Sequence, residues 1–268
     1  MTLGFSVNAL IPKARVAGRH RMGLVRLGQG EWLQSEPDLA VRTQAFDAHP
    51  NSVIVLPEAQ APARELAALI GVDGGLEDAA RAVWEDLCIL TRGDEGSPYR
   101  FTGGAVAFPT DWRLSDKIGK PLIEVHEPID GYAEQLSEAV DAFIDGLETG
   151  AIFGRTNAFV LPTDALRYMP SDDPATRFAH VTAENAGETL YARCERETLR
   201  RLPRTGAIVF TIGVYRAPLA ELTDTNLAHL TRSLDGFSDG EHTRRAAPLY
   251  AQALAGYAAA RLGERKAA

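Results

Sequence analysis

The expected fold is decided by the stretch FTGGAVAFPTDWRLSDKIGKPLIEVHEPIDGYAEQLSEAVDAFIDGLETGAIFGRTNAFVL, residues 101–161. Its pattern predicts a strand, a polar loop, a second strand, a turn, a long helix, a loop and a third strand. The second strand, residues 121–126, is apolar and β-branched, and the Glu127-Pro128 step after it prevents the ladder from continuing. We therefore expect His126, the one histidine of the stretch, to lie at a strand end and at the mouth of a cavity.

The period of the pattern changes after Asp130. From there apolar residues recur at the spacing of one α-helical face, and they are Tyr132, Leu136, Val140, Phe143, Ile144 and Leu147. Asp130 can cap the start of this helix, and Gly150 lies where a left-handed residue would end it. One long helix is predicted between the two.

Further strands are predicted on both sides of the central stretch. Residues 51–56 (NSVIVL) indicate a short buried strand or a packed turn. Residues 189–195 and 206–215 indicate two more strands, the second rich in β-branched and aromatic side chains. Between these two, residues 196–201 form a run of charge that Leu202-Pro203 ends.

Helices are predicted before and after the strands. Two precede the central stretch, and their apolar stripes are Leu66, Leu69 and Ile70, and then Ala80, Val83, Leu87 and Leu90. Another begins near Leu219, and an Ala-rich helix covers residues 247–262. Residues 162–187, with several prolines and aspartates, indicate an irregular insertion. No repeat or linker interrupts the chain, so we expect a single α+β domain over residues 1–268, with a mainly antiparallel sheet and flanking and terminal helices.

Composition limits the functions open to the chain. Of its 268 residues 45% are hydrophobic and 24% are charged, which is typical of a globular protein. The net charge of −8 argues against a nucleic-acid partner bound through a broad basic face. No stretch approaches ~18 uninterrupted apolar residues and no signal-peptide pattern opens the chain, so we expect no membrane span and a cytoplasmic location.

Several common cofactor motifs are missing from the sequence. Cys88 and Cys194 form no CxxC or CxxH pattern, which argues against a disulfide framework, a structural zinc site or an all-cysteine iron–sulfur cluster. There is no GxGxxG opening a strand–helix unit, no P-loop and no HExxH. A nicotinamide or nucleoside triphosphate site is therefore not expected, and a redox function would take its electrons from a separate protein.

His126 is the leading candidate for a cofactor ligand. A neutral imidazole at a strand end can point one ring nitrogen into an apolar cavity while a carbonyl or carboxylate holds the other. The residues alone favour the simpler alternative, a histidine that only bonds the local backbone. His180 and Cys194 are reserve ligands, although a cysteine in an alternating strand is more often core. The remaining histidines are expected in loops or on polar helix faces; they are His20, His49, His229 and His242.

Basic side chains near these strands could hold an anionic cofactor, because guanidinium and ammonium groups pair with carboxylates. The candidates are Lys117, Arg155, Arg196, Arg200 and Arg201. The alternative for each is a solvated surface. Arg155 with Asn157 precedes the apolar residues 158–161, which favours a pocket rim for this pair.

Three further side chains have both a structural and a chemical interpretation. Trp112 and Tyr132 could wall a planar cofactor, or they could be plain core. Glu195 could bind an amine or relay a proton. It could equally form an ion pair with Arg193 or Arg196.

Four blocks of the sequence carry a family resemblance: PTDWRLSDKIG at 109–119, VHEPIDGY at 125–132, GRTNAF at 154–159 and RCERETLRRLPRTGAIVFTI at 193–212. Together they resemble the alpha subunit of haem-dependent oxidative N-demethylase and its relatives, over most of residues 20–235. Three positions depart from the family pattern. Ala158 replaces a typical tryptophan, Asp130 replaces a proline, and Glu197 replaces a glutamine.

The resemblance implies a PAS-like sheet that holds haem b. His126 would be the iron ligand, and the residues around the cofactor would be Trp112, Lys117, Tyr132, Arg155, Asn157 and Arg196. It further implies a monooxygenase that uses O2 to oxidise the methyl group of a small secondary or tertiary amine and releases formaldehyde, with Glu195 and Arg155 in catalysis.

The resemblance also implies partners. Reductase subunits would carry FMN and a 2Fe-2S cluster, and the formaldehyde would pass to tetrahydrofolate. Two other interpretations stay open: a sensor-like PAS module that binds haem or a small ligand without catalysis, and a haem-free structural subunit.

Overall fold

The protein, seen in a computed structural model, is described over residues 2–14, 22–94, 96–127 and 131–267. Within these residues seven strands form one sheet in the order β1-β5-β6-β7-β3-β4-β2, and each neighbouring pair is antiparallel. The strands are β1 (Val25–Leu27), β2 (Val53–Val55), β3 (Asp86–Thr91), β4 (Arg100–Ala105), β5 (Ile152–Leu161), β6 (Tyr191–Arg201) and β7 (Ile208–Pro218).

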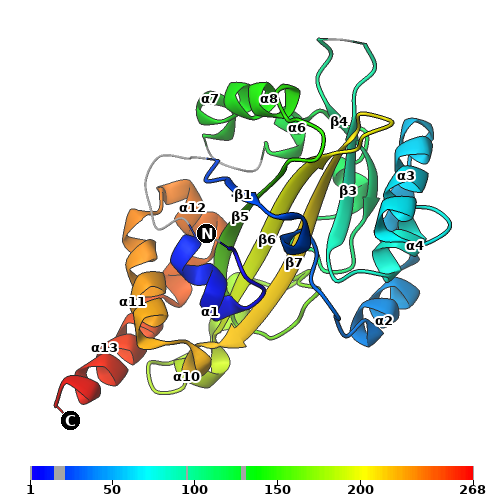
Figure 1. Ribbon diagram of the computed structural model, residues 1–268. Coiled ribbons are helices and arrows are strands. Elements are labelled where there is room, and N and C mark those ends of the chain that lie inside the picture. The colour runs from blue at the N-terminus through cyan, green and yellow to red at the C-terminus, as the bar shows by residue number, and fades with distance from the viewer. Residues whose placement is uncertain (1, 15–21, 95, 128–130, 268) are drawn as a thin grey trace.

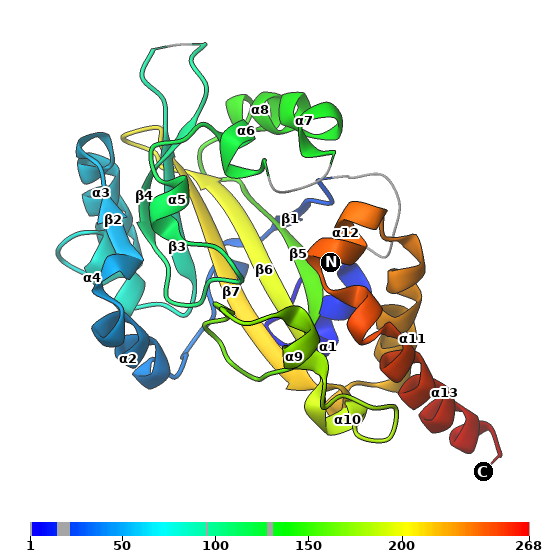
Figure 2. The ribbon, with the colours of Figure 1, turned by 180° about the vertical axis from the view of Figure 1, so that it is seen from behind.

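Helices surround this sheet, as Figures 1 and 2 show. The first seven helices are α1 (Val7–Leu10), α2 (Ala40–Ala48), α3 (Gln60–Ile70), α4 (Leu76–Arg81), α5 (Leu114–Lys117), α6 (Leu122–Val125) and α7 (Tyr132–Gln135). The others are α8 (Ser137–Asp145), α9 (Pro174–Phe178), α10 (Ala186–Thr189), α11 (Asp224–Ser233), α12 (Asp239–Arg244) and α13 (Ala251–Ala267). Helices α2, α3 and α4 gather on the β2 side of the sheet, and α11, α12 and α13 lie on the β5 side. The α+β class and the antiparallel sheet are thus confirmed.

None of the described helices has the length and apolarity needed to span a membrane.

The second strand predicted in the central stretch is wrong, because residues 122–125 form the one-turn helix α6. The amide of Val125 donates to the carbonyl of Pro121, and only an isolated bridge joins Pro121 to Arg100 of β4. Burial does not alternate as in a strand, because Leu122 is 7% exposed whereas the next two residues, Ile123 and Glu124, are both exposed. A proline before the first turn suits a helix start, and this local geometry prevails over the β propensity of the segment.

The long helix predicted after Asp130 is divided in two. Leu136 leaves helical geometry with φ −127° and separates α7 from α8, and its side chain is buried. Helix α8 ends at Asp145, well before the expected end at Gly150, although Gly150 does take the left-handed conformation, with φ +87°. Asp130, the predicted cap, lies outside the described residues.

Two other boundaries differ from prediction. The second early helix stops at Arg81, and Leu87 and Leu90 lie in β3. This strand is central and buried on both faces, so its apolar run cannot be distinguished from a helical stripe by periodicity. The charged run 196–201 is the second half of β6, paired along its whole length with β7. Its charged side chains find buried partners, which a sequence pattern does not show.

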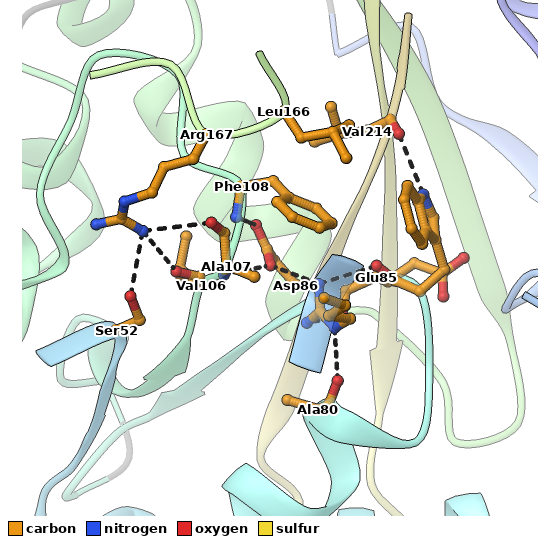
Figure 3. Close-up of polar contacts among 12 residues, drawn as sticks. Ser52, Ala80, Glu85, Asp86, Val106, Ala107, Phe108, Leu166, Arg167 and Val214 are labelled. Carbon is orange, nitrogen blue, oxygen red and sulfur yellow. Dashed lines mark hydrogen bonds and ion pairs between the residues drawn. The ribbon is translucent and has the colours of Figure 1, made fainter. Parts of the chain in front are cut away.

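A buried polar network holds the segment between β4 and α5 (Figure 3). The carboxylate of Asp86 accepts hydrogen bonds from the amides of Ala107, at 2.7 Å, and Phe108, at 3.2 Å. Arg42 pairs with Asp86 at 2.9 Å and donates to backbone carbonyls around it. From the other side Arg167 donates to the Ala107 carbonyl at 3.3 Å. These bonds fix the backbone that leads to Thr110 and the cavity described next.

Candidate functional site

A cavity of about 750 Å³ lies against strands β5, β6 and β7 and is bordered by α6, α7, α8, α11 and α12. Its volume is within the range of small-molecule and cofactor pockets. Of the predicted site residues, those that line it are Trp112, Lys117, His126, Tyr132, Arg155, Asn157 and Glu195. The sequence therefore located most of one wall, although the four blocks are far apart along the chain.

His126 ends helix α6 and has a fixed tautomer. Its Nδ1 lies 2.8 Å from the carbonyl oxygen of Leu122, one helical turn earlier. A carbonyl only accepts, so Nδ1 carries the proton and Nε2 keeps its lone pair. Nε2 has no hydrogen-bond partner among the described residues. The predicted arrangement of the ring is found, but a helix end supplies it in place of a strand end.

The surroundings of His126 keep it neutral. Burial lowers the pKa of His126 from 6.5 to about 4, and the nearby charges of Arg155 and Lys117 act in the same direction. The ring stacks on Tyr132, with centroids 4.3 Å apart and 16° between the planes. A neutral, oriented imidazole with a free Nε2 is the form that binds a metal.

Lys117 and Trp112 lie together on the same wall. Nζ of Lys117 is 5.5 Å from the centre of the Trp112 ring and donates to the carbonyl of Val125. Burial and the charge of Lys120 lower the pKa of Lys117. The hydrogen bond to Val125 thus fixes the position of the Lys117 ammonium near His126.

Arg155, Asn157 and Glu197 form a second cluster on neighbouring strands. Arg155 is opposite Glu197 in the register of β5 and β6. Glu197 accepts from Nε of Arg155 at 2.5 Å and from Nδ2 of Asn157 at 2.7 Å. The negative charge of Glu197 is the main cause of the raised pKa of Arg155. Nη1 and Nη2 of Arg155 have no hydrogen-bond partner among the described residues, so they remain for an anionic ligand.

Glu195 is held by a chain of two hydrogen bonds. Nε of Arg193 donates to Oγ1 of Thr110 at 2.9 Å, and the Thr110 hydroxyl donates to Oε1 of Glu195. Arg193 itself is 3.8 Å from Oε1, which is the weak ion pair that the sequence left open. Burial raises the pKa of Glu195, and the Arg193 charge opposes that shift. No described group bonds Oε2, so this oxygen remains for a ligand.

Arg196 was predicted to contact the cofactor, but the structure does not bring it to the described lining of the cavity. Its side chain donates to the carbonyls of Trp32, at 3.0 Å, and of Glu31, and it covers the ring of Phe5 at 4.3 Å. Side chains alternate between the two faces of a strand. Because Glu195 and Glu197 face the cavity, Arg196 between them faces the other side of the sheet.

The reserve ligands lie elsewhere. His180 is exposed and outside the cavity. Cys194 is fully buried in the apolar core, where burial raises the pKa of its thiol to about 12. Neither lines the described part of the cavity, which leaves His126 as the one ligand candidate from the sequence that does.

Several cavity residues were missed by sequence reasoning. Glu197 would have been found had β6 been extended through the charged run, because it alternates with Glu195. His229 lines the cavity from α11, although it was expected on a polar helix face. Thr110 and Arg245 also border Glu195 or the cavity, and they come from a loop and from the end of α12. Only tertiary packing brings these last three to the site.

The cavity wall is basic although the chain as a whole is acidic. Among the described lining residues the cations are Lys13, Lys117, Arg155, Arg244 and Arg245, and the anions are Glu195, Glu197 and Glu241. The wall thus has an excess of positive charge within a chain of net charge −8. No group of three or more His, Cys, Asp or Glu side chains in the described chain converges as a metal site. The wall therefore suits a ligand that has apolar surface and carries negative charge.

A comparison with protein families agrees with this chemistry. The model of the family described as haem-dependent oxidative N-demethylase, alpha subunit-like, matches residues 71–254, which is more than half of the chain. The match includes His126, the Arg155 cluster and Glu195. This chain belongs to the haem-dependent oxidative N-demethylase alpha subunit-like family.

Proposed function

We propose that this chain binds haem b in the cavity, with Nε2 of His126 as the axial ligand of the iron. The observation that carries the proposal is the state of this ring. It is neutral, its Nδ1 is bonded to the Leu122 carbonyl, and its Nε2 has no hydrogen-bond partner among the residues that the structure describes. A histidine ligand oriented in this way by a second hydrogen bond is the usual arrangement at metal centres.

The remaining walls fit the same cofactor. Trp112 and Tyr132 provide aromatic surface for a planar macrocycle, and apolar side chains from α6, α8 and β7 surround them. Lys117 and the nitrogens Nη1 and Nη2 of Arg155 would pair with the propionates. Arg196 has no part in this, because its side chain lies on the other face of the sheet. A bound haem would supply the O2 activation that these side chains cannot.

The reaction that we propose is oxidative N-demethylation of a small secondary or tertiary amine. One O2, two electrons and two protons convert the N-methyl group to formaldehyde, and the demethylated amine and water are the other products. At neutral pH such an amine is a cation, and Glu195 offers Oε2 as its partner. The hydrogen bond from Thr110 and the charge of Arg193 keep this carboxylate oriented.

Electrons would come from another protein. The family is named for an alpha subunit, which implies further subunits. We propose reductase partners that carry FMN and a 2Fe-2S cluster, and tetrahydrofolate as an acceptor for the formaldehyde.

The test is reductant-dependent turnover by the haem-loaded protein. With O2, dimethylamine and a flavin and iron–sulfur reductase, wild type should release formaldehyde, and Glu195→Gln should release at least about tenfold less because the loss of one charged hydrogen bond costs about 1.5–3 kcal/mol. Glu188→Gln, which makes the same change at an exposed carboxylate outside the described cavity lining, is the matched control. A Soret band without formaldehyde for any methylamine would leave only a haem-binding module, and absence of both would reject the proposal.

A further inference from the structure

Arg200 is a buried cation on the face of the sheet opposite to the cavity. It lies four residues after Arg196 in β6, so both side chains point to the same face, away from Glu195 and Glu197. Figures 1 and 2 show the segment between β1 and α2 crossing this face over β6 and β7. The sequence suggested Arg200 as a partner for an anionic cofactor, and the described lining of the cavity does not include it. Its role is therefore sought on this second face.

The guanidinium of Arg200 has no acceptor in the part of the chain that the structure describes. It lies 4.1 Å from the ring centre of Trp32, and the residue is only 6% exposed. Its Nε is enclosed, and no hydrogen bond or ion pair reaches the group. Burial lowers the pKa of Arg200, and no neighbouring charge opposes that shift. A buried charge without a counter-charge is costly, so this arrangement calls for an anion.

Arg196, on the same face, shows the contrast. Its side chain donates to the carbonyls of Trp32 and Glu31. Burial lowers the pKa of Arg196, and the charges of acidic groups, Glu85 and Glu31 among them, oppose that shift. Arg200 differs because no acidic group acts on it. The missing counter-charge is thus specific to Arg200 and is not a general property of this face.

The outer edge of the Arg200 guanidinium is open to a small ligand. Nε is among the enclosed atoms without a partner, whereas Nη1 and Nη2 are not, so the remaining exposure includes these two nitrogens. The stack on Trp32 holds the plane of the group. Beneath it lie Ile152 and Val209, which are directly opposite Arg200 in the neighbouring strands and are fully buried. So little exposure favours a small ligand over a broad protein surface.

We propose that Arg200 is the centre of an anion site, which takes a small oxyanion with a phosphate or carboxylate group on Nη1 and Nη2. A planar guanidinium bonds two oxygens of such a group through parallel N–H donors, and a group already held in place loses little freedom on binding. The site is on the other face of the sheet from the cavity, so it does not depend on the proposed function. The bound anion supplies the missing counter-charge and thereby stabilises the folded state.

The test is urea unfolding of the haem-loaded protein in phosphate and in chloride at equal ionic strength. Calorimetry gives the dissociation constant for phosphate. At ten times that concentration the folded-to-unfolded ratio should rise about tenfold more in wild type than in Arg200→Met. Phosphate also stabilises proteins by its exclusion from their surface, and the comparison between variants removes that effect. Arg64→Met, the same change at an exposed arginine of α3, should keep the wild-type gain. Acetate in place of phosphate shows whether a carboxylate binds as well.

The variants also respond differently without the anion. In chloride Arg200→Met should be at least as stable as wild type, because an apolar side chain of similar length removes a buried, unpaired charge. A loss of stability as large as that expected for a variant of Arg196 would show that Arg200 has a partner inside the protein and would overturn the inference.

Equal gains from phosphate in wild type and Arg200→Met would overturn it too, as would calorimetry that finds no binding of phosphate or acetate to wild type. Should Arg200→Met fail to fold, Arg200→Lys keeps the charge but loses the paired donors. This variant should bind phosphate more weakly than wild type, and undiminished binding would contradict the proposed site.

Discussion

The imidazole of His126 and the phenol ring of Tyr132 lie nearly parallel, with their centroids 4.3 Å apart. His126 comes from the end of α6 and Tyr132 from the start of α7. Together with the Nδ1 bond to Leu122, this stack defines the direction of Nε2. Two short helices therefore hold the proposed ligand, and the stack is a contact between them.

Removing the stack should leave the imidazole of His126 less well oriented and weaken haem binding. Tyr132→Leu should weaken haem binding by about 0.5–1.5 kcal/mol, the typical worth of an aromatic pair, because the imidazole loses its orientation. Tyr132→Phe keeps the ring and should bind haem as wild type does. Haem titration followed by absorbance measures both. Equal affinity in the leucine variant would show that the Leu122 bond alone orients His126.

The stability of the fold should respond to pH through Glu195. Burial raises the pKa of Glu195, so the ionised form opposes folding. That cost is absent below the ordinary pKa of 4.5, where both states are protonated. It grows as the pH rises above 4.5, where the unfolded state ionises first, and it is complete above the folded-state pKa. Glu195→Gln should therefore unfold at higher urea concentration than wild type at pH 8, with the difference vanishing near pH 4. A stabilisation that is the same at both pH values would mean that ionisation of Glu195 is not its source.

Glu197→Gln is the matched comparison for this experiment. It removes one partner of the buried ion pair with Arg155, and we expect it to destabilise the fold by about 3 kcal/mol at neutral pH.

Thr110 should matter as the link between Arg193 and Glu195. Thr110→Val removes the donor to Glu195 and the acceptor of Nε of Arg193, so it should cost about 1–3 kcal/mol of stability and weaken amine binding. Thr110→Ser keeps the hydroxyl and should restore amine binding. Urea unfolding measures the stability, and calorimetry measures the affinity for the amine. Unchanged amine affinity in the valine variant would remove Thr110 from the account of the site.

Substitution of Arg196 should change the stability of the fold but not haem affinity, whereas substitution of Arg155 should change haem affinity. Arg196→Met removes hydrogen bonds to the carbonyls of Glu31 and Trp32 and should cost about 2–5 kcal/mol of folding free energy without changing haem affinity per folded molecule. Arg155→Met should lower haem affinity at least about threefold through loss of its proposed charge pair with a propionate, and it should also cost stability because its partly buried ion pair with Glu197 is lost. Circular dichroism shows whether each variant is folded, and haem titration of the folded variants then measures the change in haem affinity. A haem defect in Arg196→Met would contradict the placement of its side chain.

Much of the sheet could be predicted from the sequence, because β5 and β7 contain β-branched and aromatic runs bounded by turn residues. Strand β3 could not, since a strand buried on both faces shows no alternation. The second half of β6 was missed because its arginines and glutamate are paired inside the protein. Burial of charge depends on tertiary partners that local propensity does not contain.

Candidate site residues could be predicted from the sequence where the residue type is rare, as for the one histidine of the central stretch. They could not be predicted where tertiary packing alone brings a side chain to the cavity. His126 stood out by residue type and by its neighbours, although its segment is helical. Residues 196–201 were left out of the predicted strand, and alternation along the full strand would have placed the side chain of Arg196 on the face opposite to that of Glu195. Arg245 and His229 come from helices that only the fold brings against β5.

The central claim is tested most directly by the absorption spectrum of the protein loaded with haem, for wild type, His126→Gly and His229→Ala. We expect a Soret band in wild type and in His229→Ala, and a band that is shifted or lost in His126→Gly. Added imidazole should restore the wild-type band in His126→Gly, because it replaces the missing ligand in a cavity that the substitution enlarges. A Soret band that is identical in wild type and His126→Gly, with or without imidazole, would contradict ligation of the iron by His126.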